Sequence, residues 1–401
     1  MKPTTGTAAA AAVDRRWLLP LAIGSALSLL LLVLLTTFPL PFPFPSSAAS
    51  RPPNPTLFVE HKLAPSPPST ASPPRFAYLI SGSAGDAAAL RRVLLALYHP
   101  RNLYILHLDA EAPDSDRANL AADLADHPVI AAAANVHVIQ RANLVTYRGP
   151  TMVANTLQRR RRLPLHQPTP ALGVGLVHQP LRLRLPAPHA GWYQRAKPVI
   201  IDPGLYMKKK ADVFWIPQRR SVPTAFKLFT GSAWMALSKP FVEYCIWGWD
   251  NLPRTVLMYY ANFISSPEGY FHTVVCNAEE FKNTTVNHDL HYISWDNPPK
   301  QHPHYLTIED LDRMVASDAP FARKFHADDP VLDKIDAEIL LRGPDMLTPG
   351  GWCGGTRENG SDPCSVIGNT THLQPGRGAV RLQRLMTSLL SEEKFHPRQC
   401  K

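Results

Sequence analysis

Apolar residues between positions 75 and 158 fall into two alternating patterns. Short continuous apolar runs, typical of buried strands, are found at 75–82, 102–109 and 135–140. Apolar residues spaced three or four apart, typical of helices, are found at 85–100, 115–128 and 146–158. Strands that alternate with helices predict a parallel α/β sheet. Ligands of such sheets bind beyond the carboxyl ends of the strands.

Regular patterns continue in the second half of the chain. Residues 222–247 predict a strand, a glycine turn, a second strand and a helix. An acidic turn opens a predicted helix at 265–277. Residues 291–307 are rich in aromatic residues, histidine and proline and predict an irregular loop, whereas 308–326 predict a helix that ends in a basic pair.

The N-terminal region predicts a membrane anchor. Residues 17–38 form an uncharged run of 22 residues, preceded by Arg15 and Arg16. A helix of about 20 residues crosses a bilayer, and the flanking positive charges place the tail 1–16 in the cytosol. A cleaved signal peptide is the alternative, but its apolar core is normally about 7–15 residues long.

The segment that follows predicts a disordered stem. Residues 39–74 contain 12 prolines among serine, alanine and threonine, a composition that cannot build a core. A short tail, one span, a stem and a large lumenal domain at 75–401 make a single-pass type II membrane protein. Because this layout is common among Golgi enzymes, we expect a Golgi membrane location.

Cysteines and sequons are consistent with a lumenal domain. The chain has five cysteines, and we expect Cys353 and Cys364 to pair because they are close in sequence. They do not resemble a zinc site, since no second pair of ligands accompanies them. Three sequons predict N-glycosylation, at Asn283, Asn359 and Asn369.

Several polar residues stand where parallel sheets and helices carry chemistry. Asp109 and the Ser81–Gly82 turn follow two predicted strands, although Asp109 could equally cap a loop. Glu268 lies in the predicted first turn of a helix, where a carboxylate is either an ordinary N-terminal cap or a general base on a rigid support. Arg323 and Lys324 are either solvated charges or ligands of a diphosphate.

Eight collinear strings carry a family resemblance. They are RFAYLISG, ALYHPRNLYILHLD, LVTYRGPTMV, YQRAKPVIIDPGLY, FKLFTGSAWMALS, SSPEGYFHTVVCN, VNHDLHYISWDNPPKQHPHYL and PFARKFH. Together they span about 75–350, and the chain is identified by them as similar to the plant branch of the core-2/I-branching glycosyltransferase family (glycosyltransferase family 14). The subgroup that it resembles most is the β-glucuronosyltransferases of arabinogalactan proteins.

The resemblance implies a GT-A-like, Rossmann-type mixed sheet with flanking helices and an inverting reaction without a metal or other cofactor. The implied donor is UDP-glucuronate and the implied acceptor a β-galactan chain of a glycoprotein; UDP-N-acetylglucosamine and UDP-xylose remain alternative donors. Glu268 matches the catalytic carboxylate, with Thr273 at the matching offset behind it. In place of a metal, basic side chains would stabilise the departing UDP.

The other site residues follow from the same matches. The positions implied for the donor are Ser81, Gly82, Asp109, Tyr147, Lys300, Arg323 and Lys324. Lys300 is included because the second basic contact of the family falls by spacing on its neighbour Gln301. The positions implied for the acceptor are Tyr292, Trp295 and Asp296.

One stretch, 158–192, fits none of these patterns. It contains six arginines, six prolines and no acidic residue, and it accounts for six of the ten net positive charges of the chain. Family members carry DWFINLSASDYPL here, followed by a loop of about 30 residues. Synonymous codons for Gly175–Pro188, read one base out of register, translate as those 13 residues. We therefore predict that 158–192 is an out-of-frame translation that replaces a donor-site segment.

Two other interpretations of 158–192 are weaker. An arginine-rich run can bind nucleic acid, but this one follows the predicted span and would be lumenal, so we expect no nucleic-acid partner. A linker between domains is also disfavoured, because both flanks belong to one domain of the family. We expect the chain to lack a central strand beside the donor site and to fold poorly or without activity. An inactive Golgi protein that acts only as a partner is the alternative function.

Overall fold

The computed structural model describes residues 26–29, 73–161, 171–174, 196–207, 212–248, 250–298, 300, 302–356 and 360–400. The predicted tail, almost all of the predicted span and stem, and most of 158–192 lie outside these residues. No helix within the described ranges has both the length and the apolar character to cross a membrane. Residues 73–400 belong to one compact unit, and only that unit is considered below.

Helices and strands alternate through the first half of this unit. In chain order they are β1 (Phe76–Gly82), α3 (Ala87–Leu97), β2 (Leu103–Leu108), α4 (Asp114–Ala125), α5 (Pro128–Ala133), β3 (Val136–Val138), α6 (Thr151–Arg161), β4 (Ala171–Val174), β5 (Pro198–Ile201), η3 (Pro203–Leu205) and β6 (Phe214–Arg219). The predicted strands at 75–82, 102–109 and 135–140 are confirmed, and the predicted helices match α3, α4 and α6 apart from their ends.

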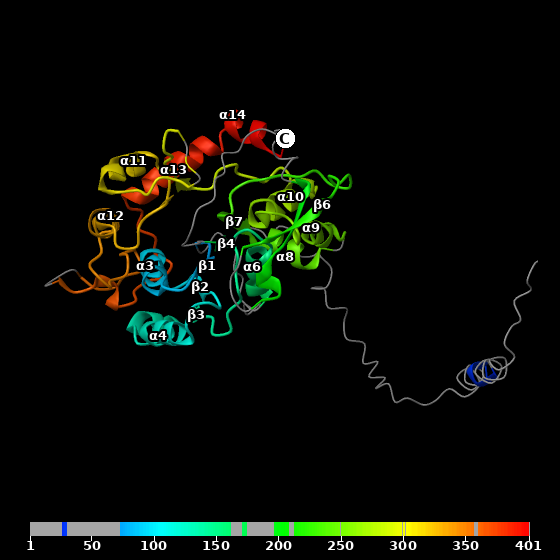
Figure 1. Ribbon diagram of the computed structural model, residues 1–401. Helices are drawn as coiled ribbons and strands as arrows, with labels where there is room; N and C mark the ends of the chain where they lie inside the picture. Colours follow the sequence, from blue (N-terminus) through cyan, green and yellow to red (C-terminus); the bar gives the residue numbers. More distant parts are fainter. Residues whose placement is uncertain are drawn as a thin grey trace, which may run out of the picture. The chain divides into compact units, whose positions relative to one another are not determined.

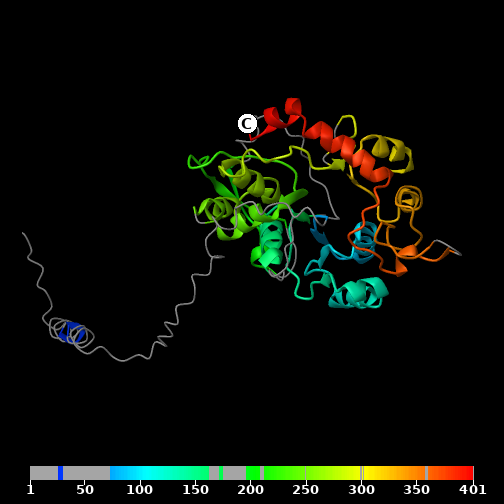
Figure 2. The ribbon, with the colours of Figure 1, turned by 180° about the vertical axis from the view of Figure 1, so that it is seen from behind.

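The second half is mostly helical. Its elements are β7 (Met235–Ser238), α8 (Lys239–Trp247), α9 (Leu252–Tyr260), η4 (Ser266–Glu268), α10 (Tyr270–Asn277), β8 (His291–Tyr292), η5 (Ile308–Asp310), α11 (Leu311–Ala316), β9 (Phe321–Ala322), α12 (Pro330–Lys334), η6 (Ile335–Ile339), η8 (Pro363–Ser365), α13 (Arg377–Leu389), α14 (Glu392–Phe395) and η9 (His396–Arg398). Figures 1 and 2 show α13 alongside α11 from both sides, and Arg384 in α13 forms an ion pair at 2.6 Å with Asp318, two residues after the end of α11.

A five-stranded mixed sheet organises the unit, with strand order β3-β2-β1-β4-β7. The first four strands are parallel, and β7 pairs antiparallel with β4. Alternate residues of β1 face opposite sides: Ile80 packs beneath α3 and α4, whereas Leu79 packs toward α8, α9 and α10. The result is three layers, with the sheet between two sets of helices (Figure 1). The predicted α/β class is confirmed.

The expectation of a missing central strand is wrong in one respect. Residues 171–174, inside the anomalous stretch, form β4 between β1 and β7. However, β4 pairs only with the first three residues of β1, Phe76 to Tyr78. On its other side β1 pairs with β2 as far as Gly82. Among the described residues, the carboxyl half of β1 therefore has a strand partner on one side only.

Residues 222–234 do not form the predicted strand. Their backbone bonds instead to groups on η4 and α10: Lys227 N–H donates to Asn277 Oδ1 at 2.9 Å, and Phe229 N–H to Thr273 Oγ1 at 3.0 Å. Gly231 N–H donates to the carbonyl of Glu268 at 2.8 Å. The apolar run was misread because side chains, and not a neighbouring strand, satisfy its backbone groups.

The helix predicted at 308–326 is shorter than expected. It ends at Ala316, and Asp318 then adopts a left-handed conformation (φ 58°), which leads the chain into β9. The basic pair at 323–324 therefore follows a short strand and not a helix.

Two disulfides are present. Cys353 pairs with Cys364 as predicted, with an Sγ–Sγ distance of 2.14 Å. Cys276, in α10, pairs with Cys400, which no sequence pattern indicated. Cys245 is a buried free thiol.

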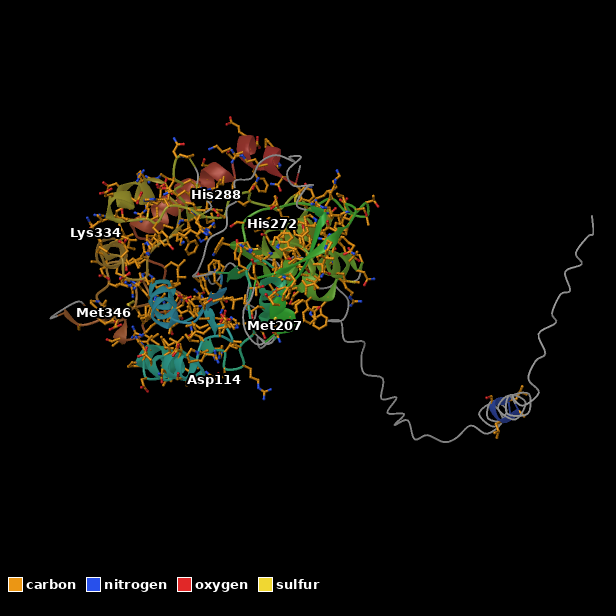
Figure 3. All side chains as sticks on the ribbon, in the orientation of Figure 1. Asp114, Met207, His272, His288, Lys334 and Met346 are labelled. Carbon is orange, nitrogen blue, oxygen red and sulfur yellow. A yellow bond between two sulfur atoms is a disulfide. The ribbon has the colours of Figure 1, made fainter. Side chains whose placement is uncertain are left out.

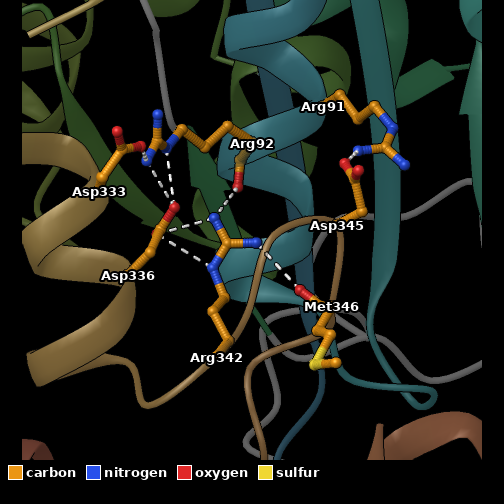
Figure 4. A network of polar contacts seen from close by, with 7 residues as sticks. All are labelled: Arg91, Arg92, Asp333, Asp336, Arg342, Asp345 and Met346. Carbon is orange, nitrogen blue, oxygen red and sulfur yellow. Dashed lines mark hydrogen bonds and ion pairs between the residues drawn. The ribbon is translucent and has the colours of Figure 1, made fainter. Parts of the chain in front are cut away.

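A network of ion pairs fixes α3 to the segment 333–346 (Figure 4). At its centre, the Arg342 side chain is only 2% exposed. It donates to Asp336 Oδ1 at 2.7 and 3.0 Å and to the carbonyl of Met346 at 3.0 Å. Arg92, in α3, contacts the same Asp336 at 2.7 Å and also Asp333.

Replacing Arg342 with alanine is expected to destabilise the protein by about 3 kcal/mol, because it removes the buried guanidinium that bonds both Asp336 and the carbonyl of Met346. Thermal or denaturant unfolding measures the loss. The matched control is Arg92→Ala, expected to cost about 1 kcal/mol since that side chain and Asp333 are more exposed. Equal losses for the two variants would contradict the proposed importance of burial.

Candidate active site

Glu268 occupies a buried turn between two helices. It closes the 3-10 helix η4, two residues before α10 begins, so the predicted acidic turn is present but separate from the helix itself. Glu268 is 1% exposed. Its carbonyl accepts bonds from Gly231 N–H at 2.8 Å and from the Thr230 hydroxyl at 3.2 Å. Segments distant in sequence thus hold the backbone of Glu268 in place.

The hydroxyl of Tyr147 donates to Glu268 Oε1 at 3.1 Å. Burial raises the pKa of Tyr147, and the neighbouring Glu268 carboxylate raises it further. Tyr147 therefore remains protonated near neutral pH and acts as the donor in this bond. Its ring lies 6.0 Å from that of Trp234, which is itself buried.

Arg323 brings a positive charge to the same region. Its guanidinium stacks on Trp234, 3.5 Å from the ring centroid. Burial lowers the pKa of Arg323, and this effect is opposed by its electrostatic interactions with Asp289, Tyr147 and Glu268. Arg323 thus shares an electrostatic environment with Glu268, although the two residues are 55 positions apart.

The helix behind Glu268 is closely packed. The hydroxyl of Thr273 lies 2.8 Å from that of Tyr260. Burial lowers the pKa of His272, labelled in Figure 3, to about 4, so this side chain is neutral near pH 7. A side chain at Gly231 would fall 2.2 Å from the His272 ring, which explains why glycine is needed there.

A second group of candidate residues lies at the neighbouring carboxyl ends of β1 and β2. Asp109 N–H donates to the carbonyl of Gly82 at 3.0 Å, and Ser81 lies opposite His107 in the paired strands. Asp109 is 2% exposed, and its carboxylate accepts from Glu111 N–H at 3.0 Å. It therefore does cap its loop, as the simpler interpretation predicted.

The remaining basic candidates are Lys300, inside the irregular loop 291–307, and Lys324, which follows β9. Lys324 Nζ is 3.8 Å from the ring centroid of Tyr305. Lys300 pairs with Asp296 at 3.2 Å and is 76% exposed, so this lysine already has a partner. Gln301, the family's alternative position, lies outside the described residues.

The predicted acceptor residues are only half-buried. Tyr292, in β8, packs partly against the small cluster around Leu306, and its carbonyl accepts from Arg323 N–H at 3.0 Å. Trp295 and Asp296 follow within the loop. Tyr292 is thereby linked to the residue that stacks on Trp234.

The sequence model of the Core-2/I-Branching enzyme family matches residues 76–167 and 186–315. The chain belongs to the Core-2/I-Branching enzyme family. It is 62% identical over 369 residues to Beta-glucuronosyltransferase GlcAT14A of Arabidopsis thaliana, covering 86% of this chain and 82% of the relative. It is 56% identical over 420 residues to Beta-glucuronosyltransferase GlcAT14B of the same species, covering 97% of this chain and 96% of the relative.

Part of the chain is also similar, at lower identity, to a xylosyltransferase. Xylosyltransferase 1 of Rattus norvegicus is 26% identical over 153 residues, which cover 34% of this chain and 18% of that relative.

The Core-2/I-Branching enzyme model leaves residues 168–185 unmatched, within the anomalous stretch 158–192. The alignment with GlcAT14B is 19 positions longer than this 401-residue chain, so at least that many residues of the relative have no counterpart here.

Two of the three sequons of this Core-2/I-Branching enzyme lie on described, exposed surface, namely Asn283 and Asn369. Asn369 Oδ1 accepts from the Thr371 hydroxyl at 2.7 Å. Asn359 lies outside the described residues. The described residues contain no group of three or more His, Cys, Asp or Glu side chains that could hold a metal ion.

Two residues of the candidate site, Trp234 and Asp202, were not predicted from the sequence. Trp234 lies in an apolar run that was interpreted only as a strand, and Asp202 lies in one of the matching strings but carried no signal of its own. Asp202 is fully buried and accepts from the Thr151 hydroxyl at 3.0 Å. A lone acidic residue directly after the apolar run 198–201 could have indicated it.

Proposed function

We propose that the chain is an inverting β-glucuronosyltransferase that transfers glucuronic acid from UDP-glucuronate to a hydroxyl group of a β-galactan chain on a glycoprotein. The observation that carries the proposal is the buried carboxylate of Glu268, held by Tyr147 in a chain 62% identical to a relative named Beta-glucuronosyltransferase. The mixed sheet with helices on both faces supports a GT-A-like fold.

In the proposed mechanism Glu268 removes the proton of the acceptor hydroxyl as its oxygen attacks the anomeric carbon of the donor. The bond between that carbon and the β-phosphate breaks from the opposite face, so the configuration is inverted and UDP leaves. Negative charge develops on the β-phosphate. Lys324 and Arg323 would stabilise it without a metal ion.

The donor would lie along the carboxyl ends of β1 and β2. Ser81, Gly82 and Asp109 meet there, and the nucleoside-binding role that the family resemblance implies for them suits this edge of the sheet. Lys300 is proposed as a minor contributor, because its pairing with Asp296 and its exposure limit its effect on a phosphate. Tyr292, Trp295 and Asp296 are proposed to contact the acceptor.

A Golgi location in a type II orientation is part of the proposal. The uncharged run at 17–38, the two disulfides and the exposed sequon residues Asn283 and Asn369 support it.

A donor screen tests the reaction. The full chain, and the same chain with residues 158–192 replaced by the corresponding segment of GlcAT14A, are incubated with β-galactan oligosaccharides and UDP-glucuronate, UDP-xylose or UDP-N-acetylglucosamine, and the products are analysed by mass spectrometry and NMR. We expect glucuronate transfer with a β-linkage by the chain with the replaced segment, and slower or no transfer by the unaltered chain. UDP-xylose is the second candidate donor, favoured by the similarity to Xylosyltransferase 1. Transfer from UDP-xylose alone would replace the first proposal.

A further inference from the structure

The bond between Tyr147 and Glu268 joins two segments that are 121 residues apart. Tyr147 lies in the loop 144–150, which precedes α6, whereas Glu268 lies in η4. A second bond ties these segments together, since Ser265 N–H donates to the carbonyl of Arg148 at 2.7 Å. The position of the Tyr147 loop therefore affects the position of the Glu268 carboxylate.

Three buried polar residues, Thr146, Thr151 and Asp202, form a hydrogen-bonded relay that fixes that loop. The Thr151 hydroxyl accepts from Thr146 N–H at 2.8 Å and lies 3.0 Å from Asp202 Oδ2, to which it donates. Asp202 Oδ1 accepts from Gly204 N–H at 2.8 Å. Thr146, Thr151 and Asp202 are all buried.

The relay requires the loop that contains Tyr147 to lie close to the Asp202 carboxylate. A side chain at Gly149 would fall 2.0 Å from Asp202 Oδ2, so only glycine lets the loop lie against this carboxylate. Buried polar networks whose members are all bonded have one favourable arrangement, which makes them suited to fixing a loop. The same carboxylate also caps η3, so Asp202 joins the Tyr147 loop to the start of that short helix.

We propose that Tyr147 is a positioning residue for the base Glu268, and that buried Asp202 holds the Tyr147 loop in place through Thr151. The inference rests on the proposed function, because it takes Glu268 as the base. It changes the role of Tyr147 from the donor contact implied by the family resemblance to support of the reacting carboxylate.

A hydrogen bond donated to a carboxylate favours its ionised form, which is the form that a base requires. Arg323, directly after β9, interacts electrostatically with Glu268 and with Asp289. His291, in β8, interacts with the same Arg323 and Asp289, and His272 lies on α10, four residues after Glu268. Arg323 also favours the ionised form, whereas Asp289 opposes it. Burial lowers the pKa of both histidines, so they carry little charge near pH 7.

The first test replaces Tyr147 with phenylalanine, which keeps the ring and removes the donor. Titration of the Glu268 carboxyl, followed by infrared or ¹³C NMR and assigned by its loss in Glu268→Gln, should move upward by about one pH unit. The acid limb of the rate profile should move with it, while the Kd for UDP changes less than twofold. An unchanged titration would overturn the inference.

The relay is tested with a matched pair at Thr151. Thr151→Val keeps the shape but removes the hydroxyl, and we expect kcat to fall about tenfold without loss of UDP binding. Thr151→Ser retains the hydroxyl and should behave as the unaltered chain. Equal kcat values for Thr151→Val and Thr151→Ser would show that the relay has no positioning role. Absence of glucuronate transfer both by the unaltered chain and by a chain whose residues 158–192 are replaced with the corresponding segment of GlcAT14A, with the Tyr147→Phe titration shift present, would refute the proposed function and leave the pairing of Tyr147 and Glu268 supported.

Discussion

Glu268→Gln should lower kcat for glucuronate transfer by about 10³-fold, because glutamine cannot accept the proton of the acceptor hydroxyl. The amide keeps the size of the side chain and can still accept the bond from Tyr147. We therefore expect the Kd for UDP and the thermal stability to change little. Initial rates with radiolabelled UDP-glucuronate and calorimetric titration with UDP measure these quantities separately.

The control for this variant is Glu279→Gln. Glu279 follows α10 on the surface, and its side chain is 83% exposed and pairs only with Lys282 among the described residues. Such a pair contributes about 1 kcal/mol or less, so activity should remain unchanged. If Glu268→Gln retained turnover while the chain remained folded, Glu268 would not be the base.

Replacing residues 158–192 with the corresponding segment of GlcAT14A should raise both stability and activity. A full strand would extend the pairing of β1 beyond Tyr78, where its pairing with β4 now stops, and would reach the proposed donor edge at Ser81 and Gly82. Burial of two or more large apolar side chains adds about 3 kcal/mol. We expect the Tm to rise by about 5–10 °C.

The effect on the reaction should be larger than the effect on stability. Misplacement of binding groups by 1 Å can cost about 10²-fold in rate, so we expect kcat/KM to rise by on the order of 10²-fold. A glycine- and serine-rich replacement of equal length is the control, since it restores length without a strand. Equal turnover by the unaltered and repaired chains would refute the out-of-frame interpretation. Sequencing of full-length cDNA across this stretch tests its origin directly.

The sequence predicted the parts of the fold whose information is local. Strands β1 and β2 are continuous apolar runs, and the turn at Ser81–Gly82 and the loop at Asp109 follow directly from where these runs end. Glu268 was chosen as a candidate because an acidic residue at the start of a helix is a local signal. These features depend on neighbours within a few positions.

The sequence could not predict contacts that depend on distant segments. The run 222–234 looked like a strand because nothing in it shows that Asn277 and Thr273 would satisfy its backbone groups. The bond between Tyr147 and Glu268, and the support that Asp202 gives through Thr151, likewise exist only once the chain has folded. Chain order carries no signal for such pairings.

The disulfide between Cys276 and Cys400 has a practical consequence. It ties the helix directly behind Glu268 to a residue 124 positions later. Gln399 reinforces the tie, since its side chain bonds to the backbone and hydroxyl of Thr285. Trimming the last few residues to obtain a shorter expression product would therefore remove this support of the turn that contains Glu268, whereas an affinity tag added after Lys401 would keep Gln399 and Cys400 in the chain.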